Sequence, residues 1–172
     1  MNGLLCVAFL AVALNAVSAQ QLSIPRNLRF LVRTVSSLDS SHLKPGDPAE
    51  FELVASVRGA GGVVLLPAGA RFRGKVAQAA GLSSGQAQLA VLLTEVAWDG
   101  RTAKLATCFN TSQPREVRSA STSEGPAFTW SDFVVRQDPR YGAIITSTMH
   151  DVVLPAGTEL FLQQCELPSL AQ

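Results

Sequence analysis

The tetrapeptide Leu-Pro-Ala-Gly occurs twice in this 172-residue chain, at Leu66–Gly69 and at Leu154–Gly157. Each copy separates an aliphatic run from a segment in which apolar and polar residues alternate. Proline fixes φ near the value that the second position of a tight turn needs, and the following glycine adopts the positive φ that closes the turn. The repeat therefore predicts two strand–turn–strand units and an all-β fold. The predicted corner residues are Pro67, Gly69, Pro155 and Gly157.

The amino-terminal segment has the form of a secretory signal. The first 25 residues carry no charged side chain, and Leu4–Leu14 is an unbroken apolar run. Such a run is too short to cross a bilayer comfortably, and Val17 and Ala19 are side chains that a signal peptidase accepts at its two recognition positions. We expect residues 1–19 to be removed and residues 20–172 to form a single domain, because roughly 150 residues suffice for one core. An uncleaved membrane anchor is the alternative.

The charge and cysteine content indicate which classes of partner are disfavoured and whether a disulfide can form. With 14 basic and 13 acidic residues and no block of like charge, the chain is a poor candidate for binding nucleic acid or an anionic surface. Cys6 lies in the leader, and two remaining cysteines in an oxidising compartment suggest one disulfide. Whether Cys108 and Cys165 are joined stays open, because spacing alone does not show that their Cβ atoms meet.

From Asn27 onward the apolar residues recur with a period of two, and Pro and Gly fall between the alternating segments. This pattern predicts about eight or nine strands. We expect them to form a small antiparallel β-barrel, closed or partly open, because exposed sheet edges invite aggregation; a β-sandwich is the alternative. The expected strands lie near 28–33, 50–57, 63–66, 71–76, 86–98, 101–109, 130–136, 143–153 and 158–164.

The dipeptide Asp99-Gly100 predicts a two-residue hairpin, because both residues tolerate the positive φ of a type I′ turn. The resulting register places Glu95 opposite Lys104, a complementary charge pair, and Val91 opposite Cys108. One face of the hairpin is then expected to be core: Trp98, Val96, Leu92, Leu105 and Phe109.

The clearest half-buried strand follows the first tetrapeptide. Its outward residues are Arg71, Arg73 and Lys75, three cations that can meet an acidic partner or an anionic glycan; a solvated strand face is the alternative. Gly74 takes an inward position in the same strand. A glycine there predicts a bulge, a sharp bend or a closely passing backbone, as is common where a sheet curls into a barrel.

A Ser/Thr-rich stretch, residues 111–129, predicts a long exposed loop, which is either functional or mobile. The sequon Asn110–Ser112 begins one residue before this stretch and matters only in a eukaryotic secretory pathway. After the loop, Trp130 and Tyr141 with Phe128 are candidates for an aromatic binding platform, although such residues more often pack at an edge.

The reactive side chains form no recognisable catalytic or metal-binding motif. Asp151 directly follows His150, and neighbouring strand residues point to opposite faces, which argues against a shared metal ion. No Gly-x-Ser-x-Gly elbow is present, and the glycine-rich stretch 59–62 lacks the Lys-Ser/Thr of a phosphate loop. We expect no cofactor, no metal and no enzymatic activity. An enzyme would need a pocket that holds His42 or His150 beside a Ser or Cys.

Several segments together resemble a recurring bacterial pattern: Lys44-Pro45-Gly46-Asp47, 51–57, 63–70, Phe72, Gly74, Val76 and Trp98-Asp99-Gly100. They are similar to the β-barrel domain of envelope-spanning proteins of conjugation and type IV secretion systems, and to small exported bacterial proteins with the same pattern. The resemblance covers residues 44–109 and 152–162. It implies a barrel that is periplasmic or secreted and acts through protein contacts without a cofactor, and it supplies no catalytic residues. The chain shows no proline-rich spacer and no apolar helical hairpin, so we expect no channel.

These observations lead to one expectation about function. The chain is expected to be an exported, non-enzymatic structural or protein-interaction module of the bacterial cell envelope, and its partners are envelope proteins or a second copy of itself. A module that binds glycan or peptidoglycan fragments is the alternative. The candidate binding residues are Arg71, Arg73, Lys75, Trp130 and Tyr141.

Overall fold

The structure is a computed structural model that describes residues 24–26, 28–113 and 130–166. The predicted signal segment, residues 1–19, and positions 114–129 of the predicted loop lie outside the described residues. Within the described ranges the chain forms strands and short 3-10 turns, with no α-helix. None of its helical turns has the length and apolar character needed to span a membrane.

The described part contains strands of very different lengths. The bounds are β1 (Arg29–Thr34), β2 (Leu38–Asp39), β3 (Pro48–Leu53), β4 (Val57–Arg58), β5 (Val64–Leu66), β6 (Arg71–Ala80), β7 (Ala87–Trp98), β8 (Arg101–Phe109), β9 (Val134–Asp138), β10 (Gly142–Ser147), β11 (Val153–Leu154) and β12 (Glu159–Gln164). The 3-10 turns are η1 (Ala60–Gly62), η2 (Leu82–Ser84) and η3 (Trp130–Asp132).

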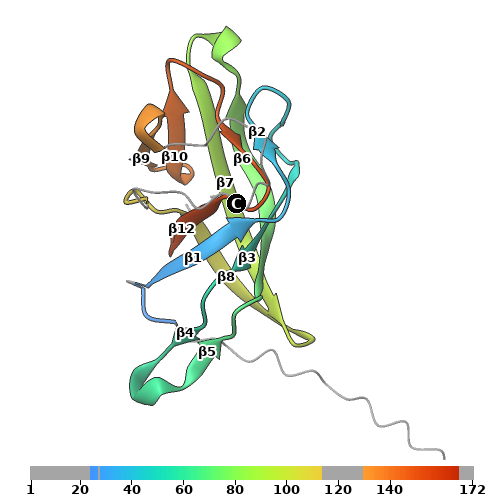
Figure 1. The fold of residues 1–172 in the computed structure, drawn as a ribbon, viewed down its shortest axis with the longest axis vertical. Helices are drawn as coiled ribbons and strands as arrows, with labels where there is room; N and C mark the ends of the chain where they lie inside the picture. The colour runs from blue at the N-terminus through green and yellow to red at the C-terminus, as the bar shows by residue number, and fades with distance from the viewer. Residues whose placement is uncertain (1–23, 27, 114–129, 167–172) are drawn as a thin grey trace, which may run out of the picture.

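Six strands close into an antiparallel barrel (Figure 1). The order is β6-β3-β1-β12-β8-β7, and β6 also pairs with β7, which returns the sheet onto itself. The start of β7 pairs with β10, which carries β9 at its other side, so these two strands extend the sheet beyond the barrel. Closure leaves the six barrel strands without a free edge. The predicted barrel is confirmed; the main sheet has eight strands, and two short ribbons, β2–β11 and β4–β5, accompany it.

Phenylalanines from four barrel strands fill the interior. Phe30 and Phe72 are fully buried, and their ring centroids lie 5.2 Å apart. Phe51 and Phe109 are also fully buried and meet edge to face, with centroids 6.3 Å apart. Each ring removes a large apolar area from water, and tilted or edge-on pairs add about 0.5–1.5 kcal/mol beyond that burial. The alternation that predicted the strands therefore reflects a filled barrel interior.

The two Leu-Pro-Ala-Gly segments form the predicted corners. Gly69 has φ of 84° and Gly157 has φ of 81°. The Gly69 N–H donates to the Leu53 carbonyl at 2.8 Å, and the Gly157 N–H donates to the Thr34 carbonyl at 2.8 Å. Both turns are thus fastened in the same way to the end of a neighbouring strand, β3 in one case and β1 in the other.

The position of proline in these turns differs from the prediction. The Ala70 N–H donates to the Pro67 carbonyl at 3.2 Å, and the Thr158 N–H donates to the Pro155 carbonyl at 3.1 Å. These bonds make proline the first residue of each four-residue turn, alanine the second and glycine the third. The positive φ of the glycine is therefore the essential feature, and the expectation that proline fills the second position is wrong.

The two turns belong to a larger internal repeat. In one copy, β3 pairs with β6 and the short β4 pairs with β5; in the other, β1 pairs with β12 and the short β2 pairs with β11. The registers correspond, because Val57 opposite Leu66 matches Leu38 opposite Leu154. Each copy is a long strand, a short ribbon, the proline–glycine turn and a second long strand. Figure 1 shows the β4–β5 ribbon at the lower end of the barrel and β2 on the upper half.

The hairpin between β7 and β8 confirms most of the predicted register. Asp99 and Gly100 have φ of 45° and 72°, as a type I′ turn requires, and Glu95 lies opposite Lys104. The register changes between Leu93 and Glu95, where Leu93 pairs with Thr107.

That change of register overturns two expectations. The predicted opposition of Val91 and Cys108 is wrong, because Cys108 lies one position out of that register, across from Gln163 on its other side. The expectation that Leu92 is a core residue is also wrong. Leu93 is fully buried, and Leu92 is only partly buried.

Three of the expected strands are divided or begin late in the structure. The expected strand 50–57 divides into β3 and β4, and 143–153 divides into β10 and β11. Residues 130–132 form η3, and β9 begins only at Val134. Residues 148–152 connect β10 and β11 without strand structure. The expected strand 143–153 contained both Ser147 and His150, whereas in the structure Ser147 ends β10 and His150 lies in the connection.

Candidate functional site

The pairing of β6 with β7 is interrupted twice beside Gly74. Thr94 is an extra residue in β7, between the Arg73–Glu95 and Gly74–Leu93 pairs, and Ala77 is an extra residue in β6. A Cβ atom added to Gly74 would lie 2.1 Å from the Leu92 carbonyl oxygen. The predicted bulge and the predicted close approach of another backbone are both confirmed at Gly74. Such bulges bend the sheet locally and open space between neighbouring side chains.

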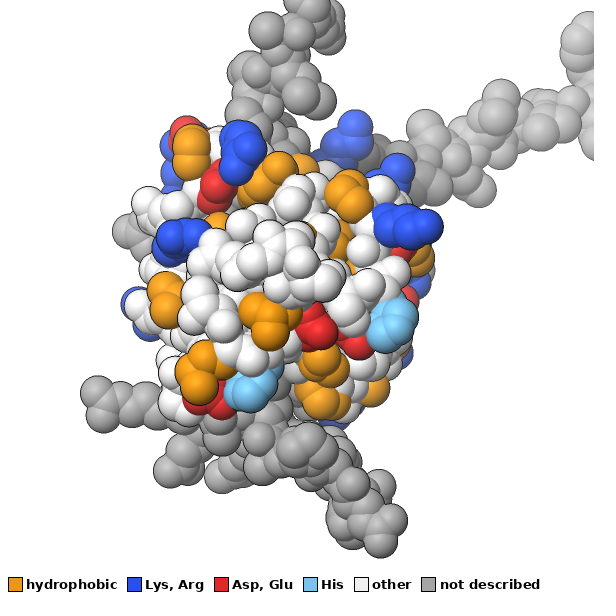
Figure 2. Space-filling model, turned by 90° about the horizontal axis from the view of Figure 1, so that it is seen from above, with side chains coloured by type: hydrophobic (Ala, Val, Ile, Leu, Met, Phe, Trp, Pro, Cys, Tyr) orange, Lys and Arg blue, Asp and Glu red, His pale blue; other side chains and the backbone are white. Residues whose placement is uncertain are grey.

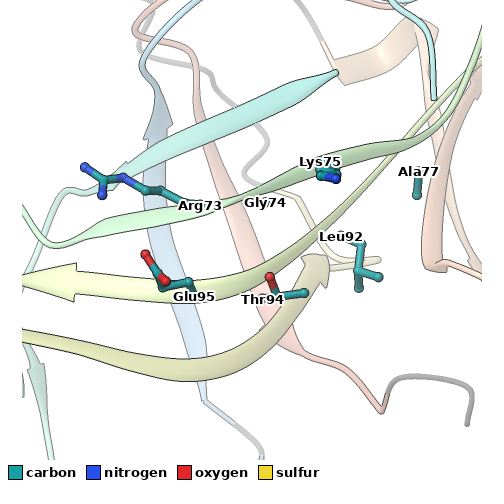
Figure 3. A pocket seen from close by; sticks show the side chains of 7 residues that line it. All are labelled: Arg73, Gly74, Lys75, Ala77, Leu92, Thr94 and Glu95. Carbon is teal, nitrogen blue, oxygen red and sulfur yellow. The ribbon is translucent and has the colours of Figure 1, made fainter. Parts of the chain in front are cut away.

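A pocket of about 450 Å³ lies at these two bulges. Figure 3 shows Arg73 and Glu95 toward one end, Ala77 and Leu92 toward the other, and Gly74 and Lys75 between them. The pocket opens to solvent, because Arg73, Lys75 and Thr94 are exposed. Its lining residues are Arg73, Gly74, Lys75, Ala77, Leu92, Thr94 and Glu95.

The predicted basic stripe is partly neutralised by β3. Arg71 lies 3.0 Å from a carboxylate oxygen of Glu52 and 3.6 Å from one of Glu50, and Arg73 lies 3.2 Å from Glu50. Register explains the pairs, because Glu50 lies opposite Arg73 and Glu52 opposite Arg71. Exposed ion pairs of this kind contribute about 0–1 kcal/mol. Their main effect here is to leave less free positive charge than three adjacent cations suggest.

Lys75 is the cation of the stripe that remains available. It makes no ion pair with any residue in the described part of the chain, and its β3 neighbour is Pro48. Because Lys75 is exposed and borders the pocket, its ammonium group can bind an anionic group of a ligand without first breaking an internal pair.

The predicted aromatic platform is not present at this pocket. Trp130 is only 8% exposed and packs edge to face against Phe133, with ring centroids 6.5 Å apart, which favours the packing alternative over a binding platform. Tyr141 is half-buried; its hydroxyl lies 3.4 Å from Gln78 Oε1, and the Arg140 guanidinium lies 4.9 Å from its ring. Phe128 lies outside the described residues. The five predicted binding residues therefore do not form one site.

A serine, a histidine and an aspartate meet at the turn after β2, which the sequence argument did not foresee. His42 Nδ1 lies 3.1 Å from Ser41 Oγ and 2.9 Å from Asp39 Oδ2, and the Ser41 N–H donates to Asp39 at 2.9 Å. Burial raises the pKa of Asp39, but the hydrogen bonds from Ser41 and His42 outweigh it and lower the pKa below the usual value. The Asp-x-Ser-His spacing is typical of an Asx turn and is the signal that would have revealed this cluster.

The geometry of this cluster does not suit nucleophilic catalysis. Serine and aspartate contact the same ring nitrogen, whereas a triad uses both nitrogens of the imidazole. The His42 side chain is 83% exposed, and neither it nor Ser41 lines the pocket. The turn is therefore best explained as local structure.

His150 lies apart from His42. Its backbone N–H donates to Ser147 Oγ at 3.2 Å, and Asp151 accepts the N–H of Leu82 at the start of η2. Figure 2 shows the two histidine side chains separated on the face seen from above. In the described ranges, no group of three His, Cys, Asp or Glu side chains is placed to hold a metal ion.

The remaining candidates are the cysteines and the sequon. Cys108 and Cys165 are free thiols that lie side by side at the junction of β8 and β12. Asn110 is buried, and its amide group donates to Gln163 at 2.8 Å, so the folded protein does not present the acceptor side chain of this sequon to solvent.

Comparison of the chain with protein-family models and with curated proteins finds no match in either case. The resemblance to secretion-system barrels therefore stays a prediction, and the pocket beside Gly74 is the feature that bears most on function.

Proposed function

We propose that this chain is an exported protein-interaction module of the bacterial cell envelope, and that it binds its partner at the pocket beside Gly74. The observation that supports this most is the pocket itself, which two bulges form in the wall of a closed barrel. All of its lining residues lie on β6 and β7, so the pairing of these two strands holds the backbone of the pocket in place. Binding surfaces of this kind need little ordering when a partner docks.

The lining indicates the chemistry of the partner. Ala77 and Leu92 offer a small apolar surface, and Lys75 borders it with an unpaired ammonium group. At the other end Arg73 lies opposite Glu95. This arrangement suits a peptide segment that carries a small apolar side chain next to a carboxylate. The proposed role of the pocket is therefore the binding of such a segment.

Site-specific photo-crosslinking tests the proposal in intact cells. With a photoreactive amino acid at Thr94, we expect one protein adduct of defined mass, and we expect Lys75→Glu to reduce its yield about tenfold, as loss of a charged anchor with reversal of charge should do. Lys75 is exposed and unpaired, so the substitution should change the free energy of unfolding by less than about 0.5 kcal/mol. The control is the same photoreactive residue at Thr102, which is exposed on β8 outside the pocket.

Several outcomes separate the alternatives. An adduct with a second copy of the chain identifies self-association, and an adduct with another envelope protein identifies that protein as the partner. Equal adducts at Thr94 and Thr102, or a yield that Lys75→Glu leaves unchanged, contradict binding at the pocket. Binding of soluble peptidoglycan fragments by the purified protein, abolished by Lys75→Glu, would instead support the glycan alternative.

Export is a separate part of the proposal and has its own prediction. If the amino-terminal segment is a signal peptide, the mature protein begins at Gln20, and intact-mass measurement of the periplasmic or secreted fraction shows the loss of residues 1–19. Replacing Ala19 with a bulky residue should block cleavage and leave the longer species. Recovery of the uncleaved chain in the cytoplasm of normal cells would contradict export.

A further inference from the structure

Cys108 and Cys165 come together through the pairing of β8 with β12. Cys108 lies opposite Gln163 in this antiparallel pair. Cys165 follows two residues later, and its N–H donates to the Ala106 carbonyl at 3.1 Å. The two cysteines are therefore diagonal neighbours on the same face, close enough for their thiols to share a hydrogen bond. Cα atoms in this relation are about 7–8 Å apart, slightly more than a disulfide usually spans, so bond formation requires a small backbone shift, which the position of Cys165 beyond the end of β12 allows.

A third element keeps the space around the two thiols clear. Gly142, the first residue of β10, has φ of 77°. A Cβ atom added there would lie 2.4 Å from Cys108 Sγ and 3.1 Å from Cys165 Cβ. Both cysteines thus gather over the same glycine, and any larger residue would occupy the position of the Cys108 sulfur.

The two thiols are not equivalent. Cys108 is fully buried, whereas Cys165 is partly exposed just beyond the end of β12. The hydrogen bond between them raises the pKa of Cys108, as does burial, and lowers the pKa of Cys165. Because the thiolate is the nucleophile in disulfide exchange, Cys165 is suited to react first with a reagent from solution.

We propose that Cys165 and Cys108 form a redox-active dithiol that reacts with small-molecule disulfides and closes into an intramolecular disulfide. The Cys165 thiolate attacks one sulfur of the small disulfide, forms a mixed disulfide and releases one thiolate. That thiolate takes up the proton of Cys108, whose sulfur then attacks Cys165 Sγ and expels the second small thiolate. Two protein thiols are oxidised to one disulfide, and the small disulfide is reduced to two thiols.

The closed disulfide would tie β8 to the segment after β12, next to the turn between β9 and β10. This site is distinct from the pocket beside Gly74, because neither cysteine lines that pocket. The inference therefore does not rest on the proposed binding function, and the two can fail independently.

Oxidised glutathione is a suitable probe for the full chain under native conditions. The parent is Cys6→Ser, which removes the remaining cysteine of the sequence. We expect the reduced parent to become lighter by two hydrogens, with a peptide that links Cys108 to Cys165 in the mass spectrum. Cys108→Ser should instead accumulate a stable glutathione adduct on Cys165. Cys165→Ser should form its adduct at least about tenfold more slowly, because the buried Cys108 reacts only after local opening.

Circular dichroism and denaturant unfolding show first that each serine variant is folded. Persistence of both thiols in the folded parent overturns the proposal, as does a link that forms only in denaturant. Adduct formation at equal rates in the two single variants overturns the assignment of Cys165 as the reacting thiol. If Cys108→Ser does not fold, the parent is quenched rapidly after mixing with oxidised glutathione. The cysteine that carries the first glutathione adduct then shows which thiol reacts first.

Discussion

Gly74→Ala is expected to lower the free energy of unfolding by about 3 kcal/mol or more, as severe overpacking does. The added methyl group would lie 2.1 Å from the Leu92 carbonyl oxygen and 2.5 Å from the Leu93 Cα. Both atoms belong to the backbone of β7, so no side-chain rotation relieves the contact, and β6 must move away from β7. That movement breaks the pairing that closes the barrel. Urea denaturation followed by tryptophan fluorescence measures the loss.

Gly69→Ala is the matched control for this prediction. Gly69 has a positive φ of 84°, but no atom lies within 4 Å of an added Cβ. The cost there is only that of a left-handed alanine, about 1 kcal/mol. If Gly74→Ala were no more harmful than Gly69→Ala, close contact between β6 and β7 would not be the reason for the glycine.

Phe72→Ala is the second substitution with a large expected effect, a loss of about 3–5 kcal/mol in the free energy of unfolding. Phe72 is fully buried and packs against Phe30 at a centroid distance of 5.2 Å. Its removal leaves a cavity at the centre of a barrel whose walls are tied by hydrogen bonds and cannot collapse inward. Because domains of this size are stable by only about 5–15 kcal/mol, a large share of the stability would be lost.

The same denaturation measurement on Val63→Ala provides the comparison. Val63 is 63% exposed beside the β4–β5 ribbon, and its truncation should change the free energy of unfolding by less than about 0.5 kcal/mol. Losses of similar size in the two variants would contradict the central position of Phe72 in the core.

Short sequence motifs predicted the features of the fold that depend on a few neighbouring residues, such as turns and bulges. The Asp99-Gly100 turn follows from the φ values that these two residues tolerate, and Gly74 was recognisable because a strand interior rarely keeps a glycine without a reason. The register shift between Leu93 and Glu95 was not predictable in this way. It depends on how β7 meets β6 and β8 at the same time, and strand neighbours far apart in sequence leave no local signal.

In the candidate site, too, local sequence predicts some features, and others depend on contacts between strands that are distant in sequence. Alternation alone places Arg71 and Arg73 on the same face of one strand, where Arg73 is exposed and Arg71 is half-buried. Their pairing with Glu50 and Glu52 required knowing that β3 lies next to β6. Sequence alone left two alternatives for Trp130, a binding platform or packing, and the 3-10 turn η3 places it in the core. Hydrophobic burial outweighed the polar character of the neighbouring sequence.

The two copies of the internal repeat differ at one structurally equivalent position. Gly74 lies opposite Ala49, and at the equivalent place Leu162 lies opposite Phe30. Leu162 is fully buried in β12, whose pairings with β1 and β8 run without interruption, whereas β6 is bent at Gly74 and carries the pocket. The strand β12 is thus continuously paired, whereas its counterpart β6 is interrupted at the recess. Because the counterpart of Gly74 is Leu162, whose side chain would collide with the β7 backbone at the Gly74 position, transplanting the β12 sequence into β6 should fill the recess and also destabilise the closure of the barrel.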